Sequence, residues 1–342
     1  MTKTLRQPQV LKRAAWLPSC KGLFSTALLA VMWGQSLTVS AQDILRQVDS
    51  FLSMRYRKGN VDTAYVMRPR TNCTVRARLN VSGSDIETEG YEGEQHFKSL
   101  MEANRKSTLS LGVSYLGISV SAALNPAKLL GKYEDYELNL NCYGRRLGFD
   151  VIYQDAKNFT GWHDQEGMAR TELPDDMLKV QTLNLNAYYV FNNRRFSYPA
   201  AFSQSYIQRR SAGSFLLAAS GMGQKTTLDW EQGVQLKMTN ISLGAGYGYN
   251  FVPGKGWLLH ISALPTFIVY SKTSMSFCDD RVPLHYQFPE VILTSRGAVV
   301  RQWSNKFLGM SMVYTYTNIG DKNSLAVYNS KWLIRTFFGV RI

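Results

Sequence analysis

The chain has 342 residues, a formal net charge of +14, 45% hydrophobic residues, 12% aromatic residues and only 19% charged residues. This composition excludes an intrinsically disordered or collagen-like chain. No apolar stretch of roughly eighteen residues follows Ala41, which excludes transmembrane helices beyond that point.

The first residues predict a signal peptide over 1–41. Its start is cationic, with no acidic residue before Asp43, and an apolar run begins after Gly22. Val39-Ser40-Ala41 then places small residues at the −3 and −1 positions of a cleavage site. The chain is therefore expected to be exported.

Residues 42–72 are expected to form a periplasmic amino-terminal segment. Within Asp43–Lys58, apolar residues recur at helical spacing, which predicts a short amphipathic helix. They are Ile44, Leu45, Val48, Phe51 and Leu52.

From residue 73 to the end the hydrophobic pattern has a period of two, which indicates strands. Leu183, Leu185 and Ala187, for example, alternate with Asn184 and Asn186. The polar face carries small residues such as Gly, Ser, Asn and Thr, whereas the outward face of a soluble β-sandwich would be rich in Lys and Glu. Small polar side chains suit a crowded barrel lumen.

The runs predict an all-β fold, an antiparallel transmembrane β-barrel of about twelve strands. Long connections, such as Ser82–Lys106 and Asp155–Val180, alternate with short ones, such as Asn250–Gly256. Outer-membrane barrels have long outer loops and short periplasmic turns, and an even strand number puts both termini in the periplasm. The strands are expected to begin near Thr74, Ser107, Gly117, Tyr136, Arg146, Gln181, Ala212, Lys237, Trp257, Ile292, Phe307 and Ser330.

The carboxy-terminal strand carries an apolar stripe that includes Trp332, Ile334 and Phe338 and ends at Ile342. This pattern resembles the signal that the barrel-assembly machinery reads, although Phe is commoner at the last position. The machinery is thus an expected partner during insertion.

One connection breaks the alternation of long and short connections between strands. Phe191–Ser211 is long where a short turn is expected. Its aromatic residues offer apolar area and its arginines can bind carboxylates bidentately. We therefore expect either a plug folded into the lumen or a docking element for a periplasmic partner. The residues that carry this expectation are Arg195, Phe196, Tyr198, Pro199, Phe202, Arg209 and Arg210.

The lumen face is predicted to collect cations, against the acids Glu137 and Asp150. A cationic interior favours anionic solutes by focusing the electric field. Alternatively, the side chains pair and fill a narrow barrel. The cations are Arg76, Arg78, Arg146, Lys331, Arg335 and Arg341.

His260-Ile261-Ser262 is the one candidate catalytic pair. A base and a nucleophile two residues apart on one strand occur in some outer-membrane lipid hydrolases. Alternation, however, places Trp257, Leu259 and Ile261 on the lipid face, so His260 and Ser262 point into the lumen, and no Asn-Gly-Arg follows the serine. We expect a polar lumen pair, with catalysis as the alternative.

No cofactor or metal is expected. The acidic group from Asp85 to Glu94 lacks the spacing of a calcium-binding EF-hand loop. It is expected to be a solvated outer loop, bridged by divalent ions to lipopolysaccharide, so that outer-membrane lipid and lipopolysaccharide are expected partners. Export excludes nucleic acid as a partner.

The stretches RFSYPAAF (195–202) and QRRSAGS (208–214), together with Asp62–Val66 and the paired strands that end at Asn125-Pro126, resemble a Bacteroidetes family labelled domain of unknown function 4421. The resemblance extends from about Val61 to the end of the chain. It implies an outer-membrane protein and supplies no catalytic residues.

The function expected from these patterns is that of an outer-membrane barrel without enzymatic activity, acting as a narrow channel or as a structural or interaction protein of the envelope. The alternative is a phospholipase or lipid A deacylase that uses His260 and Ser262. A secreted soluble β-protein is the third hypothesis.

Overall fold

The computed structural model describes residues 61–342 except Gly93, Asn104, Gly117, 125–135, Asn158, 175–177, 229–233, 278–279, 285–289 and 322–324, and also Gln47, Ser50 and Ser53. The predicted signal peptide, 1–41, lies outside the described residues. Of the predicted helix Asp43–Lys58, only Gln47, Ser50 and Ser53 are described, and all three are helical.

The described residues form a closed antiparallel β-barrel, as the alternation predicts. A sixteen-stranded sheet curls until its strand β18 pairs with β2. Four of these strands, β3, β8, β9 and β15, lie outside the ring, which leaves twelve ring strands in the described part of the chain. The ring consists of β2 (Cys73–Glu92), β4 (Lys106–Tyr115), β5 (Ile118–Leu124), β6 (Tyr136–Tyr143), β7 (Leu147–Ala156), β10 (Leu178–Val190), β12 (Ala212–Leu228), β13 (Val234–Phe251), β14 (Trp257–Phe277), β16 (Val291–Trp303), β17 (Lys306–Asp321) and β18 (Leu325–Arg341).

The outer surface of the ring is apolar, because one side chain in two along each strand points away from the lumen. Ile261 and Phe215, for instance, are 70% and 68% exposed. Water would disfavour such a belt, whereas lipid favours it, so this is the surface of a transmembrane barrel. Further members of the belt are Leu79, Leu111, Leu183, Leu185, Leu243, Phe267, Val269, Leu308, Met310 and Phe338.

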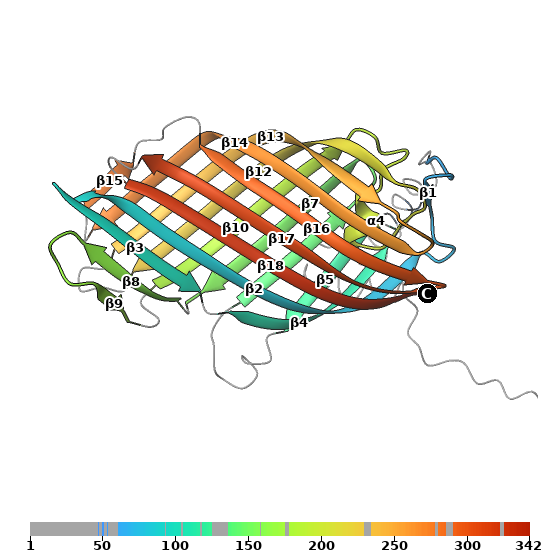
Figure 1. The fold of residues 1–342 in the computed structure, drawn as a ribbon, viewed down its shortest axis with the longest axis horizontal. Coiled ribbons are helices and arrows are strands. Elements are labelled where there is room, and N and C mark those ends of the chain that lie inside the picture. The colour runs from blue at the N-terminus through green and yellow to red at the C-terminus, as the bar shows by residue number, and fades with distance from the viewer. Residues whose placement is uncertain are drawn as a thin grey trace, which may run out of the picture.

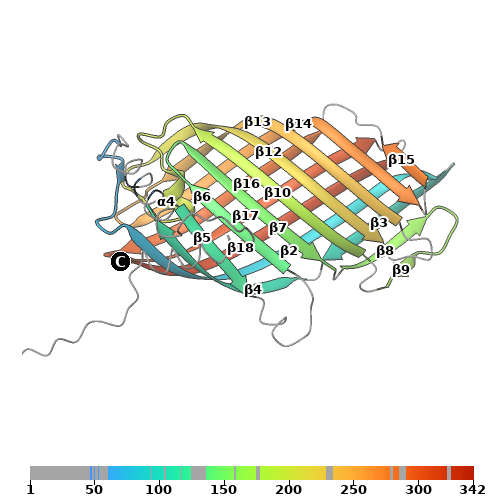
Figure 2. The ribbon, with the colours of Figure 1, turned by 180° about the vertical axis from the view of Figure 1, so that it is seen from behind.

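The two ends of the barrel differ (Figures 1 and 2). One end carries the carboxy terminus, the short helix α4 (Tyr198–Phe202) and the two-stranded sheet of β1 (Val66–Met67) and β11 (Ile207–Gln208). The other end carries β3 (Gln95–Ala103), β8 (Phe159–Gln165), β9 (Thr171–Leu173) and β15 (Asp280–Leu284). No helix within the described residues is long and apolar enough to cross a membrane.

The structure corrects the predicted outer loops. Residues 82–92 are not a loop, because β2 continues to Glu92 and pairs with β3. β3 in turn pairs with β8, and β8 with β9, so that a small sheet extends beyond the ring. The alternation did not reveal this sheet, because its few apolar side chains, such as Ile86, Met101 and Phe159, are set among polar ones and do not form a continuous stripe.

Candidate functional site

The connection between β10 and β12 folds into the lumen as a plug. We call residues 191–211 the plug segment. Its helix α4 is fully buried, and Ser197 caps it, accepting a hydrogen bond from the Ala200 backbone N–H at 3.3 Å. Pro199 lies at the start of the helix, where its fixed φ suits the first turn. Ser203 N–H then donates to Pro199 O at 3.0 Å and ends the helix.

Aromatic side chains of the plug segment pack against the barrel wall. The ring of Tyr198 lies 4.6 Å from that of Tyr188 on β10 and 5.3 Å from that of His260 on β14. Phe196 lies above Gly248, where a Cβ would come within 3.1 Å of the phenylalanine ring. These contacts make the plug segment part of the main hydrophobic core of the described residues.

Asn250 on β13 holds the plug segment by hydrogen bonds from the wall. Its Nδ2 donates to Ser197 O at 2.9 Å and to Gln208 Oε1 at 3.0 Å. Gln208 Nε2 donates in turn to Arg195 O at 2.6 Å and Arg210 O at 2.9 Å. Each amide nitrogen thus faces acceptors only, which assigns the orientation of both amides.

The assigned amide also determines the tautomer of His260. Asn250 Oδ1 lies 2.7 Å from His260 Nδ1 and can only accept, so Nδ1 carries the proton. His260 Nε2 is then an acceptor, and Ser262 Oγ donates to it at 3.0 Å. The ring of Tyr198 meets that of His260 edge to face, and the Arg296 guanidinium lies 5.9 Å from the Tyr198 ring centre. The predicted lumen orientation of His260 and Ser262 is confirmed, because both are buried and Ile261 is exposed.

Chemically, Ser262, His260 and Asn250 have the hydrogen-bond order of a serine nucleophile, a neutral base and an orienting group. Ser262, however, is 2% exposed, and Tyr198 and Phe202 of the plug segment pack against its partner His260. It also does not line the lumen cavity described below. With the plug segment in place, the three residues hold the plug rather than present a nucleophile.

Two side-chain pairs cross the lumen. Arg296 on β16 donates to Asp150 on β7 at 3.0 Å, and Lys331 on β18 donates to Gln154 on β7 at 2.7 Å. β7 lies on the opposite side of the ring from both partner strands. These pairs narrow the lumen, as the prediction of a filled interior anticipates.

The plug segment is also tied to the amino-terminal segment. β1 pairs with β11, and Arg195 Nε lies 3.3 Å from Asp62 Oδ2. The guanidinium groups of Arg195 and Arg210 lie 5.1 and 5.9 Å from the ring centre of Tyr65. Arg209 Nη1 donates to Thr63 O at 3.3 Å. The arginines expected to bind lumen carboxylates or a partner therefore contact the chain's own amino-terminal segment.

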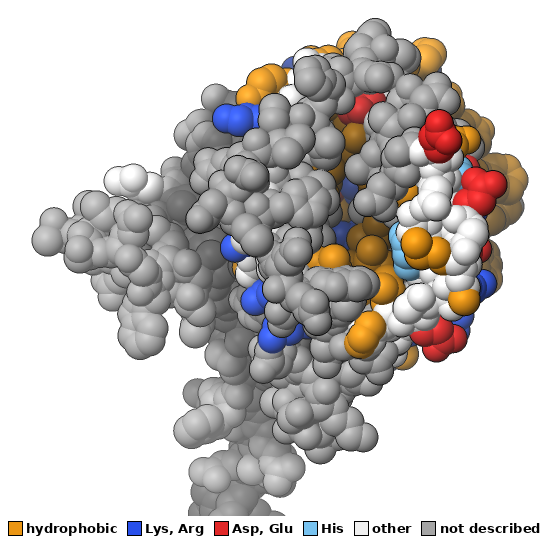
Figure 3. Space-filling model, turned by 90° about the vertical axis from the view of Figure 1, so that its left-hand side faces the viewer, with side chains coloured by type: hydrophobic (Ala, Val, Ile, Leu, Met, Phe, Trp, Pro, Cys, Tyr) orange, Lys and Arg blue, Asp and Glu red, His pale blue; other side chains and the backbone are white. Residues whose placement is uncertain are grey.

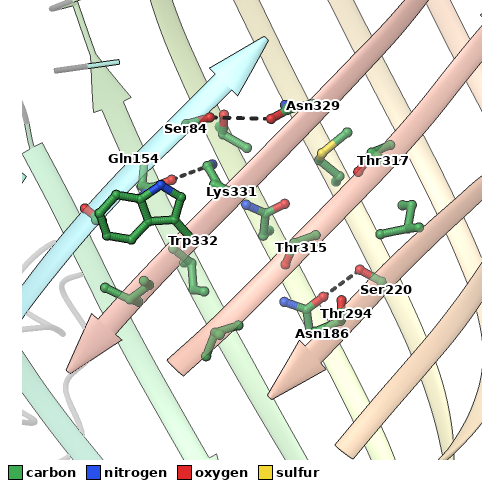
Figure 4. Close-up of a pocket in the computed structure, with 18 of the residues that line it drawn as sticks. Ser84, Gln154, Asn186, Ser220, Thr294, Thr315, Thr317, Asn329, Lys331 and Trp332 are labelled. Atoms are coloured by element: carbon green, nitrogen blue, oxygen red, sulfur yellow. Dashed lines mark hydrogen bonds between the residues drawn. The ribbon is translucent and has the colours of Figure 1, made fainter. Parts of the chain in front are cut away.

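A cavity of about 220 Å³ occupies the lumen above the plug segment, with Tyr198, Arg296 and Leu264 among the residues that line it. The end of the barrel that carries β3 and β8 is hollow, with hydrophobic and basic side chains inside and acidic ones on the rim (Figure 3). Most of the labelled lining in Figure 4 is small and polar. It includes Ser84, Asn186, Ser220, Thr294, Thr315, Thr317 and Asn329, with Lys331 and Trp332 among the larger residues.

The predicted lumen cations separate into two groups. Arg76, Arg78 and Arg341 are buried, and Lys331 and Arg335 are partly buried. Arg146 instead is exposed and precedes β7, because the chain turns there rather than continuing a strand. The side chain of Glu137 lies outside the described residues.

Sequence reasoning missed Asn250 and Arg296, two of the wall residues that contact the plug segment. Both lie on the lumen face of strands, so alternation could have found their orientation, but not their partners. No group of three or more His, Cys, Asp and Glu side chains in the described part of the chain could hold a metal ion.

The family model for Domain of unknown function (DUF4421) matches residues 60–341. A search among curated proteins gives no match. Among solved structures, the chain is similar to the outer membrane protease OmpT from Escherichia coli, with 8% identity and a TM-score of 0.47 over 79% of this chain and 97% of that one. It is also similar to the outer membrane protein OprG from Pseudomonas aeruginosa, with 12% identity and a TM-score of 0.27 over 80% and 97%.

Proposed function

We propose that the chain, which belongs to the family of domain of unknown function DUF4421, is an outer-membrane channel for small solutes that the plug segment closes on the periplasmic side. The observation that carries the proposal is the plug segment itself, which is buried in the lumen beneath a cavity lined by polar side chains. The apolar belt of the closed ring supports a membrane location. The plug end carries the carboxy terminus and the amino-terminal segment, which in such barrels lie in the periplasm.

Polar contacts with the barrel wall add to the aromatic packing that stabilises the closed state. Arg76 Nη1 donates to Phe202 O at 3.3 Å and Arg341 Nε donates to Gln204 O at 3.1 Å, while Asn250 holds Ser197. Each such bond contributes about 1 to 3 kcal/mol when its partner is charged or buried. Opening has to break these bonds and the aromatic packing of the plug segment, while the backbone pairing of the ring strands can stay intact.

Shortening the plug segment tests the proposal. Asn192 Nδ2 donates to Gly213 O at 2.8 Å, so a tight turn from Asn192 to Ala212 can replace 193–211 and leave both strands in place. We expect the shortened barrel to assemble and to show higher conductance than the wild type in planar bilayers. A matched control removes residues 166–170 of the β8–β9 connection, outside the ring, and should leave conductance unchanged. Equal conductance of the shortened barrel and the wild type would contradict the proposal.

A second candidate function, lipid hydrolysis, is favoured by one observation, the hydrogen-bond order of Ser262, His260 and Asn250. It requires the plug segment to move, because Ser262 is buried and Tyr198 of the plug segment packs against His260.

Phospholipase and lipid A deacylase assays with calcium, on both the wild type and the plug-shortened barrel, separate the two functions. If the protein is a channel, Ser262→Ala does not change the lipid hydrolysis measured with the wild type or with the plug-shortened barrel. Turnover that Ser262→Ala abolishes, and that the lumen control Ser220→Ala retains, would establish the hydrolase instead.

A further inference from the structure

Three arginines lie along the seam that closes the barrel. Arg76 and Arg78 are on β2, and Arg335 is on β18, the strand that pairs with β2. Farther along the same two strands, Ser82 and Lys331 line the cavity. At the other end of this seam, Arg76 contacts the plug segment. The three arginines therefore lie between the cavity and the plug segment.

Arg76 is buried with three of its five N–H donors unused. The residue is 1% exposed, and only its Nη1 is engaged, with Phe202 O and with Gln204 Oε1 at 3.2 Å. Its Nε and Nη2 are buried without a hydrogen-bond partner. A buried guanidinium with unused N–H groups is costly unless an acceptor satisfies it.

No carboxylate among the described residues forms an ion pair with Arg76, Arg78 or Arg335. The buried acid of this region, Asp150, lies 3.0 Å from Arg296 instead. Arg78 is also buried, at 6% exposed. Like charges close together in a poorly hydrated interior repel one another, and this repulsion favours the binding of an anion.

Glycines flank Arg76 on both neighbouring strands, Gly112 on β4 and Gly339 on β18. The Arg76 side chain itself lies over Gly112, and the ring of Phe307 lies over Gly339. A Cβ at Gly112 would lie 3.2 Å from Arg76 Nε, which is one of the two donor nitrogens without a partner. Guanidinium N–H groups arranged as a fork match the oxygens of a carboxylate or phosphate.

We propose that Arg76, Arg78 and Arg335 form a binding site for a small oxyanion, the phosphate or carboxylate group of a solute that enters the lumen. The site deepens the proposed channel function by naming the class of solute, and it rests on that function only for the route by which the solute arrives. Binding itself does not require conduction.

Calorimetric titration of the whole protein in detergent, with inorganic phosphate and with acetate as separate probes at constant ionic strength, tests the site. We expect saturable binding of at least one probe by the wild type. Arg335→Gln should bind at least about tenfold more weakly, because the variant loses a charged hydrogen-bond donor to the anion. Arg335 makes no described hydrogen bond, so this variant is expected to fold. Arg146→Gln, which removes the same charge from an exposed turn, should bind like the wild type.

Gly112→Ala provides a second test that keeps every charge. The added methyl group would cover Arg76 Nε, so the affinity for the oxyanion should fall while the net charge is unchanged. The proposed site is wrong if the wild type shows no saturable binding. It is also wrong if Arg146→Gln and Arg335→Gln weaken oxyanion binding equally. If the protein binds the oxyanion but the plug-shortened barrel does not conduct, the channel proposal is wrong and the binding site stands. If the barrel conducts but the protein does not bind the oxyanion, the binding site is wrong and the channel proposal stands.

Discussion

Asn250 is a wall residue that bonds to the plug segment at two points, Ser197 and Gln208. Its amide donates to Ser197 O and Gln208 Oε1 and accepts from His260. A side chain of similar volume without polar atoms would leave the buried His260 Nδ1–H without its acceptor. Ser197 O and Gln208 Oε1 would each lose one of their two donors. The loss of such a residue costs more than the hydrogen bonds themselves, because desolvated groups remain without partners.

Asn250→Leu is therefore expected to lower the free energy of unfolding by about 1 to 3 kcal/mol, measured by urea denaturation in detergent. It should also raise the conductance of the intact barrel, because the plug segment loses its anchor. The matched control is Asn186→Leu, which removes a lumen asparagine that bonds to Ser220 at 2.6 Å and not to the plug segment. An equal rise in conductance in both variants would show that Asn250 has no special role.

The direction of a side chain also determines what a new charge costs. Leu243 belongs to the exposed apolar belt, whereas Asn184 lines the cavity. Leu243→Arg should hinder assembly, since a cation on the lipid face costs about 2 to 4 kcal/mol near the bilayer midplane. Asn184→Arg introduces the same group into the lumen and should assemble, as judged by the yield of folded protein in outer-membrane fractions. Equal yields of the two variants would contradict the assignment of Leu243 to the lipid face and of Asn184 to the lumen.

At the scale of elements, the plug segment is the clearest departure from a simple barrel. A helix as short as α4 is not stable in isolation, so its packing against Tyr188 and His260 maintains it. β1 and β11 add backbone pairing between the plug segment and the amino-terminal segment. Displacement of the plug segment therefore has to break or carry along this small sheet.

Single cysteines in a background without native cysteines test the placement of the plug segment. Ser203 is fully buried, Arg194 is exposed at the plug end, and Met168 is exposed at the opposite end. A membrane-impermeant thiol reagent on intact cells should label Met168→Cys alone. Once the outer membrane is permeabilised, Arg194→Cys should also react, and Ser203→Cys should remain protected. Labelling of Arg194→Cys before Met168→Cys would invert the topology.

The whole molecule depends on closure between its first and last ring strands. β18 pairs with both β17 and β2, so its loss would leave two rows of backbone groups unpaired in lipid. We expect deletion of Leu325–Ile342 to abolish insertion into the outer membrane. Deletion of Asp280–Leu284 should be tolerated, because β15 pairs only with β14 and lies outside the ring. Heat-dependent mobility of the folded protein in detergent gels reports both outcomes.

Alternation along the chain was enough to predict the barrel, its twelve ring strands and the lumen orientation of His260 and Ser262. The reason is that the period of a strand and the contrast between lipid and lumen are both local properties of the sequence. The position of the excess connection, Phe191–Ser211, was likewise apparent from chain length alone.

Contacts between distant residues required the tertiary structure. Nothing local pairs Asn250 with Ser197 or Arg296 with Asp150, because the curvature of the ring brings these residues together. Alternation would also have allowed serine at the lumen-facing Gly246, yet a Cβ there would collide with the backbone of Ala263. Which side chains become partners, and how closely two strands approach, depends on how the sheet closes into a ring. The alternation of lipid-facing and lumen-facing side chains depends only on neighbours in the chain.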